Sequence, residues 1–217
     1  METGVLEPVR VVALRSLWIS GTATLLASTW SVPLALVLSS SSRAQRALAL
    51  LEALVGVPTV LVGLLVYLLL SRSGPLGFLG LLYTPTAIIL GESILVTPLI
   101  IAYAARSVSA SAASIRLLAQ TLGAGRGDTL ALIAWESLPA ITGAVVTGFS
   151  RAIGEVGIAL IAGGSIKGYT RTLTTSIALA TSMGMYREAI HLGLVLTLLS
   201  IGVSLGARVA EAWLARK

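Results

Sequence analysis

Long apolar segments that carry almost no charge constrain the fold of this chain more than any other feature. Leu17–Leu38 holds about 22 residues without a charged side chain, enough at about 1.5 Å per residue to cross a hydrocarbon core of about 30 Å. Hydrophobic residues make up 56% of the sequence, charged residues only 11%, and the mean hydropathy is +0.95. Soluble domains carry roughly 25% charged residues. The sequence therefore predicts an all-α integral membrane protein.

Gaps between charged residues predict five membrane-spanning helices in a single domain that covers residues 1–217. The expected spans are at about 17–38, 53–71, 86–105, 138–166 and 189–207. The apolar piece Phe78–Tyr83 is too short to span and predicts an interfacial or re-entrant turn. No small-residue cleavage site follows the first apolar run, so we expect a retained helix there and not a signal peptide.

Lys and Arg residues indicate the orientation of these spans. Five spans put the termini on opposite sides, and an outer N-terminus with a cytosolic C-terminus leaves more cations inside, in agreement with the positive-inside rule. The expected cytosolic cations are Arg43, Arg46, Arg106, Arg116, Arg126, Arg208, Arg216 and Lys217. The expected outer cations are Arg10, Arg15, Arg72, Lys167, Arg171 and Arg187. Residues 107–136 then form a cytosolic loop.

Composition also excludes several kinds of site. The chain has no cysteine, which rules out disulfides and thiolate metal ligands, and we expect no metal site. The net charge of +6 comes without a basic run, so nucleic acid is not an expected partner, whereas membrane lipid is. No GK[ST] sequence that would complete a P-loop is present, so this chain is not expected to hydrolyse ATP.

Four ionisable residues fall inside the predicted spans. Arg151 and Glu155 stand four apart, so on one helix they would share a face and could pair, which lowers the cost of charge in lipid. Two interpretations stay open: an ion pair that fixes helix packing, or an element of a pathway or gate. Glu92 either binds a polar group on a neighbouring helix or has a functional role. His191 lies near the outer end of the last span, which favours an interfacial histidine over a proton relay.

A segment rich in glycine and hydroxyl residues separates the last two spans. Residues 163–175 contain two cations, Lys167 and Arg171, and several threonines, including Thr170 and Thr172. The segment has no carboxylate. Donors and positive charge in this combination suit an oxyanion. A hydrated outer loop with turn-forming glycines and Thr residues that cap a short helix explains the same pattern.

The cytosolic loop contains a second short pattern, from Leu117 to Ala124. Ala119 and Gly123 stand four apart, so on a helix these small residues would share a face and let another surface approach closely. The segment resembles the EAA loop of ABC-transporter permeases, which docks onto the ATPase subunit. The resemblance implies coupling contacts at Leu118, Ala119, Leu122, Gly123 and Ala124. Leu117 and Leu118 replace the usual Glu and Ala, so docking would depend on shape and apolar contact.

Longer blocks resemble the oxyanion permeases of the molybdate, sulfate and tungstate group. The residues that carry this likeness are Arg151–Gly157, Gly163–Ile166 and Thr170–Thr175, together with Gly63–Gly77 and Tyr83–Thr86. The Thr170–Thr175 block is most similar to the tungstate branch. The likeness extends from about Leu14 onward, with a departure at Ser165, where Asn is expected. The spacing from Gly123 to Pro139 is longer than in the usual EAA pattern and is similar to that of the tungstate branch.

This resemblance implies the transmembrane subunit of an oxyanion importer with the core of a type I ABC importer and a cytosolic coupling helix. Two copies would surround a central pathway, two ATPases would supply ATP and Mg²⁺ chemistry, and an outer binding protein would deliver tungstate. A molybdate or sulfate permease of the same group is the alternative. A secondary carrier would show internal repeats, and an intramembrane hydrolase would pair His191 with a serine; neither has a supporting motif.

Overall fold

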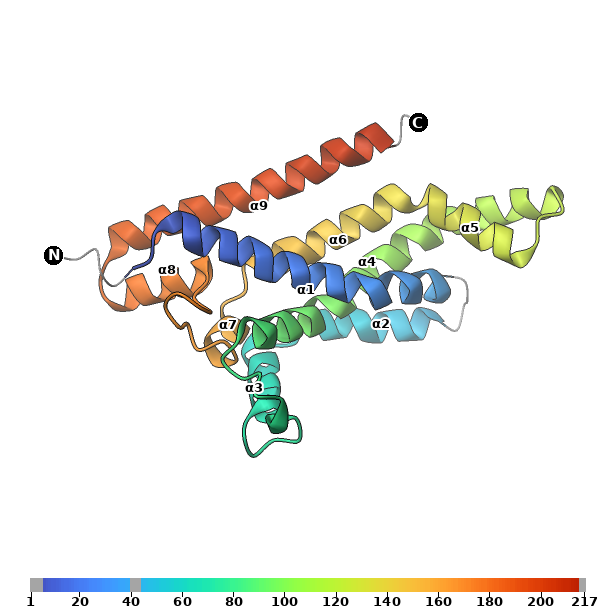
Figure 1. Ribbon diagram of the computed structural model, residues 1–217. Coiled ribbons are helices and arrows are strands. Elements are labelled where there is room, and N and C mark those ends of the chain that lie inside the picture. The colour runs from blue at the N-terminus through green and yellow to red at the C-terminus, as the bar shows by residue number, and fades with distance from the viewer. Residues whose placement is uncertain (1–5, 40–43, 215–217) are drawn as a thin grey trace.

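The computed structural model describes residues 6–39 and 44–214 as helices joined by short loops, with no strand in these two ranges (Figure 1). The helices are α1 (Val9–Leu38), α2 (Ala44–Val55), α3 (Thr59–Leu70), η1 (Gly77–Leu79), α4 (Pro85–Thr121), α5 (Arg126–Glu136), α6 (Leu138–Ile153), α7 (Gly157–Ile161), α8 (Leu173–Ser182) and α9 (Tyr186–Leu214). The all-α fold class is confirmed. Arg43, Arg216 and Lys217, which the orientation argument counted, lie outside the described residues.

The long helices α1, α4, α6 and α9 form the body of the molecule, and α3 with η1 projects from it (Figure 1). α4 is the central helix, since it packs on α1, α2, α3 and α6. α1 turns a face of small residues inward, including Ser20, Ala23, Ala27 and Ser31, all at most 3% exposed. Small side chains let helix backbones approach closely, which is how membrane helices gain packing energy without a hydrophobic driving force.

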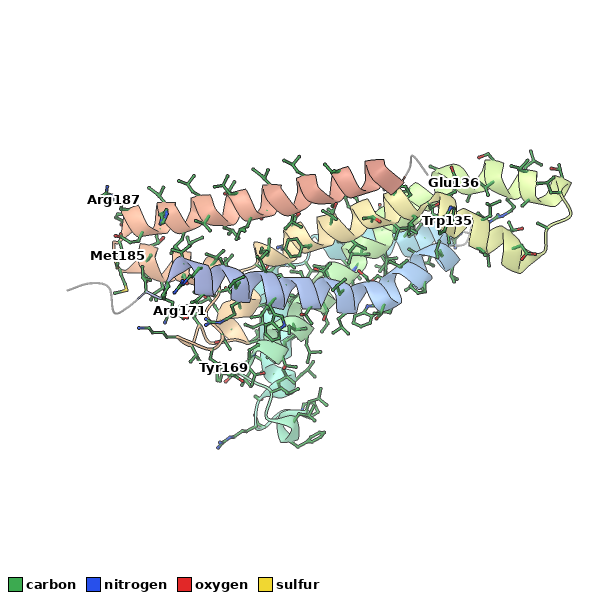
Figure 2. All side chains as sticks on the ribbon, turned by 45° about the horizontal axis from the view of Figure 1, so that its top comes forward. Trp135, Glu136, Tyr169, Arg171, Met185 and Arg187 are labelled. Carbon is green, nitrogen blue, oxygen red and sulfur yellow. The ribbon has the colours of Figure 1, made fainter. Side chains whose placement is uncertain are left out.

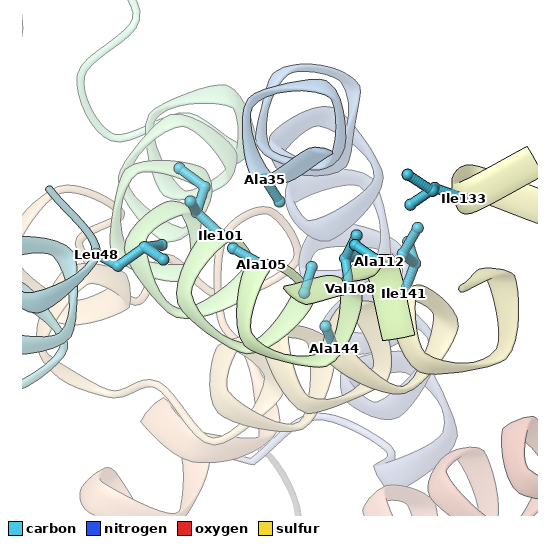
Figure 3. Packing of buried hydrophobic residues seen from close by; sticks show 10 residues of the cluster. Ala35, Leu48, Ile101, Ala105, Val108, Ala112, Ile133, Ile141 and Ala144 are labelled. Carbon is cyan, nitrogen blue, oxygen red and sulfur yellow. The ribbon is translucent and has the colours of Figure 1, made fainter. Parts of the chain in front are cut away.

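Short aliphatic side chains fill the core where α1, α2, α4, α5 and α6 meet (Figure 3). The residues shown there are Ala35, Leu48, Ile101, Ala105, Val108, Ala112, Ile133, Ile141 and Ala144. Ile133 of α5 joins this cluster at 2% exposure. The α5 helix is therefore attached to the body through α4 and does not hang free.

Three helices are long and apolar enough to cross a membrane by themselves: α1, the first 26 residues of α4 and the first 22 of α9. They contain the predicted spans 17–38, 86–105 and 189–207. Two further spans are possible as bent pairs, α2 with α3 and α5 with α6. α4 remains one helix through Pro98, because neighbouring helices can compensate for a proline in a membrane helix.

The predicted span 53–71 is not one continuous helix in the structure. α2 ends at Val55 and α3 starts at Thr59, and the two axes differ by 92°. Pro58 precedes the first residue of α3, where its missing N–H leaves no helical bond unmade. The predicted turn over Phe78–Tyr83 is present: η1 and a left-handed Gly80 reverse the chain there.

The predicted span 138–166 is also interrupted. α6 ends at Ile153, Gly154 follows, and a new short helix, α7, begins at Gly157. Glu155 therefore lies in the break and not on the same helix as Arg151. The break occurs because the Glu155 carboxylate accepts the first backbone N–H groups of α7, so that a new helix starts beside the end of the old one.

The loop predicted at 107–136 is largely helical. α4 continues to Thr121, a turn follows, and α5 returns toward the body (Figure 1). The turn uses Gly123 with φ of 69°, and the Ala124 N–H donates to the Ala119 carbonyl at 2.9 Å. This is the geometry of a glycine-terminated helix. The prediction that Ala119 and Gly123 share a helix face is wrong, because Gly123 lies beyond the end of the helix.

Candidate functional site

A polar junction forms where α6 ends and α7 begins. Arg151 Nη1 donates to Glu155 Oε2 at 2.9 Å, so the predicted pair exists although the two residues are not on one helix. Glu155 Oε1 accepts the N–H groups of Gly157 at 2.8 Å and Ile158 at 3.3 Å. The Glu155 side chain is 3% exposed, whereas that of Arg151 is 36% exposed. The carboxylate is thus held inside the protein, and the guanidinium borders an open surface.

Threonines of the predicted anion loop support this junction from α8. Thr174 Oγ1 donates to the Glu155 carbonyl at 2.7 Å. Thr172 caps α8: its side chain accepts from the Thr175 N–H, and the Thr175 side chain accepts from the Thr172 N–H. This is a capping box built from two threonines. The prediction that Thr residues cap a short helix is confirmed.

Thr170 closes the loop that precedes α8. Its hydroxyl donates to the Gly163 carbonyl at 2.6 Å and accepts from the Ile166 N–H at 2.9 Å, and the residue is fully buried. The backbone nearby is strained, since Ser165 has φ of 48°, a conformation unusual for a residue with a side chain. The hydroxyls of Thr170 and Thr172 are therefore engaged in shaping the loop, and their role toward an ion stays a prediction.

A clamp at the N-terminal end of α1 holds the same loop. Glu7 binds Arg15 at 3.0 Å and accepts the Gly168 N–H at 2.9 Å, and Arg15 donates to the Arg171 carbonyl at 2.7 Å. Burial disfavours ionisation of Glu7, but hydrogen bonds from Arg15 and the Gly168 N–H and the charges of Arg15 and Arg171 outweigh burial and lower the pKa of the Glu7 carboxyl. The clamp is therefore charged at neutral pH.

Glu92 of α4 lies beside this junction. It is 2% exposed, it interacts with the Ser20 side chain of α1, and it lies near enough to Glu155 for the two carboxyls to interact. Within the described part of the chain, its Oε2 atom has no hydrogen-bond partner. A buried polar atom without a partner is uncommon in proteins. The predicted interaction of Glu92 with a polar neighbour therefore involves only one of its two carboxyl oxygens.

The segment predicted to contact an ATPase lies at the far end of the molecule, where α4 and α5 meet (Figure 1). Leu118 and Leu122 are 57% and 75% exposed, but Ala119 is 1% exposed and faces the chain's own interior. Trp135, which Figure 2 labels at the end of α5, is 75% exposed. The exposed surface therefore includes several large apolar side chains, and the coupling role of this segment stays a prediction.

The sequence argument missed several residues of the junction. Ser16 of α1 accepts the Leu173 N–H at 2.8 Å and so attaches α8 to α1. Ser16, Ser20 and Thr24 recur every four residues and are all at most 3% exposed. This regular spacing of hydroxyls within an apolar helix was a signal for a polar inner face.

The remaining candidate, His191, lies in the second turn of α9 and is exposed. It lines, with Glu7 and Glu188, a cavity of about 520 Å³ at the end of the molecule. Among the described residues, no three His, Asp or Glu side chains come together as metal ligands would.

Comparison with known proteins identifies the family. The tungstate uptake system permease protein TupB of Peptoclostridium acidaminophilum is 45% identical over 191 residues, which are 87% of this chain and 84% of that protein. The chain belongs to the ABC-transporter permease family that contains this protein. A probable anion ABC transporter permease protein of Haloferax volcanii is 36% identical over 90% of this chain and 88% of its own length.

A second tungstate uptake system permease protein, TupB of Campylobacter jejuni, is 39% identical to this chain. The match covers 66% of this chain and 60% of the Campylobacter protein. No protein-family model matches. The family resemblance drawn from the sequence blocks is confirmed. Membership favours a permease over a secondary carrier or an intramembrane hydrolase, and it identifies the chain as a multi-pass membrane protein.

Proposed function

We propose that this permease forms the transmembrane pathway of an ATP-driven tungstate importer. The observation that carries the proposal is the 45% identity, over most of both chains, to a protein named as a tungstate uptake permease. ATP hydrolysis belongs to a separate ATPase that binds ATP and Mg²⁺. An extracytoplasmic binding protein delivers the ion, and two copies of the permease enclose the pathway.

The α4–α5 hairpin is the proposed docking site for the ATPase. Leu118 and Leu122 at the end of α4 and Trp135 of α5 supply exposed apolar area, which is typical of a surface that binds another protein. Gly123 makes the turn that brings these helices together. Ala119 supports the hairpin from inside. The proposed orientation therefore has the hairpin and the C-terminus in the cytosol and the N-terminus outside.

The polar junction is the proposed gate. Arg151 is held by one hydrogen bond to a buried carboxylate and is otherwise directed to an open surface. A tungstate dianion can compete for the free N–H groups of the guanidinium, since charge-assisted hydrogen bonds to oxyanions are strong. Glu155 keeps its two backbone donors during such an exchange. Movement of the ATPases would open and close the junction in alternating access.

Uptake into proteoliposomes tests the function. The permease is reconstituted with its cognate ATPase and binding protein, and internal tungsten is measured by mass spectrometry after addition of tungstate and ATP. ATP-dependent accumulation supports the proposal, and a partner ATPase without its Walker lysine is the control. Equal or preferred uptake of molybdate or sulfate from an equimolar mixture would assign the permease to another branch, and no ATP-dependent uptake of any oxyanion would reject the importer.

A further inference from the structure

A groove lined by hydroxyl groups lies between α4, α6 and α9, separate from the loop residues discussed above. Its volume is about 410 Å³. The hydroxyl residues that line it are Tyr103 and Ser107 of α4, Thr147 and Ser150 of α6, and Ser204 of α9. The other lining residues are glycine, alanine and valine. A second cavity, of about 460 Å³, shares Tyr103 and Ser107 and extends to Arg106, which is bound there to the carboxylate of Glu52.

These hydroxyls belong to apolar helices, yet several of them are not covered by the chain. Tyr103 is 54% exposed, and Ser107 and Thr147 are also exposed. The Thr147 hydroxyl donates to the Gly143 carbonyl at 2.8 Å, whereas a hydroxyl that faced lipid without a partner would cost free energy. α4 is a poor candidate for a lipid-facing helix, because 72% of the residues in its most apolar stretch are buried within the chain. The corresponding share for α9 is 6%.

Two faces of α9 carry side chains of different chemical character. Exposed aliphatic residues recur along its outer side, at Ile190, Leu194, Leu198, Ile201 and Leu205. Ser204 and Ala207 line the groove on another side. The aliphatic stripe suits lipid, and the small polar face suits water or an ion.

Among the described residues that line it, the groove offers donors without a competing carboxylate. Ser150 and Ser204 share one hydrogen bond at 3.1 Å, so of their two hydroxyl protons one is left to donate. Tyr103 and Ser107 each add a hydroxyl. Weak, neutral donors bind a dianion loosely, which lets the ion leave again. Ser150 directly precedes Arg151, so the groove begins beside the proposed gate.

We propose that this groove is the wall along which the oxyanion passes between the Arg151–Glu155 pair and the cytosolic end of α4. The ion moves from Arg151 past Ser150 and Ser204 to Tyr103 and Ser107, and leaves near Arg106. The inference rests on the proposed function, because it assigns the route of the same ion. It predicts that Tyr103, Thr147 and Ser204 meet water and that Leu198 meets lipid or protein.

Single cysteines test the route, because the natural chain has none. Thr147→Cys and Ser204→Cys are made with Leu198→Cys as the control, whose parent residue is 69% exposed on the aliphatic stripe of α9. The assembly in lipid nanodiscs is treated with an anionic methanethiosulfonate. The cysteine thiolate attacks the divalent sulfur of the reagent and expels methanesulfinate. The product is a mixed disulfide that carries the sulfonate group of the reagent. Nanodiscs expose both faces, so the result does not depend on orientation.

The groove cysteines are expected to react at least about tenfold faster than Leu198→Cys, since a thiol in hydrocarbon does not ionise. In proteoliposomes, labelling them should abolish tungstate uptake, and reduction of the disulfide should restore it. Reaction as slow as in Leu198→Cys, or labelling without loss of uptake, would overturn the route. Absence of uptake by the unmodified chain would instead reject the importer, so the two failures are distinguishable.

Discussion

Removal of either partner of the Arg151–Glu155 pair should cost unequal amounts of stability. Breaking a buried ion pair typically costs about 3–5 kcal/mol. In Arg151→Gln, Glu155 keeps the N–H groups of Gly157 and Ile158, so we expect a loss of about 2–3 kcal/mol. In Glu155→Gln the amide oxygen can still accept an N–H, and Arg151, at 36% side-chain exposure, can reach water. There we expect about 1–2 kcal/mol.

The double variant leaves no unpaired charge, so its loss should be smaller than the sum of the single losses by about 1–2 kcal/mol. The free energy of unfolding is measured by SDS titration in mixed micelles, and tungstate uptake is measured in parallel. For stability alone, the Arg106–Glu52 pair is a matched control, because its side chains are 71% and 33% exposed; its uptake is not compared, since Arg106 lies at the proposed exit of the ion. Its coupling should be about 0–0.5 kcal/mol.

Additive losses at Arg151 and Glu155 in both stability and uptake would refute the pairing argument. Loss of uptake in Arg151→Gln with full retention of folded protein, and no recovery in the double variant, would show instead that Arg151 acts on the ion independently of Glu155.

Three further changes test other parts of the structure. Gly123→Trp should lower tungstate uptake per ATP hydrolysed while membrane insertion is kept, with Gly123→Asn as the control because Asn tolerates a positive φ; normal coupled uptake would contradict the docking surface. Gly63→Ala should cost about 1–3 kcal/mol, since a Cβ there would lie 3.1 Å from the backbone of α7, whereas at Gly21 no atom lies within 4 Å; equal losses in thermal unfolding would contradict that contact. The Glu7 clamp has a lowered carboxyl pKa, so its stabilisation is full above the ordinary value of 4.5 and is lost as the pH falls through the lowered pKa. Hydrogen exchange at 166–170 should show this acid opening in the parent, whereas Glu7→Gln, which has no titrating carboxyl at this position, should lose the pH dependence; identical pH profiles would contradict the assignment.

Apolar segments were sufficient to predict the class of protein and its three longest helices, α1, α4 and α9. Uncharged runs long enough to cross a bilayer leave the backbone few options except a helix, so the helices over 17–38, 86–105 and 189–207 could be predicted directly. The family could be predicted as well, since several blocks agree in order and spacing. The capping threonines of α8 were predictable because a cap is a local interaction.

Breaks in helices depended on contacts that no local pattern shows. The end of α6 requires the Glu155 carboxylate to accept N–H groups of α7, and the 92° bend before α3 requires α3 to pack on α7. The buried position of Ala119 depends on how α5 folds back on α4. Spacing gives the face of a residue on a straight helix, but only tertiary packing determines where the helix ends and which face is covered.

The sequence by itself thus determined the solvent of this protein, its fold class and its family, because hydrophobic length and residue order are properties of the chain. The tertiary structure decided which polar groups meet. Arg151 and Glu155 pair across a helix break, one Glu92 oxygen has no partner among the described residues, and hydroxyls of α4, α6 and α9 converge on one groove. Arg151 and Glu155 are near neighbours in the sequence, but Glu92 and the groove hydroxyls come from segments far apart, and helix packing sets their separation in space.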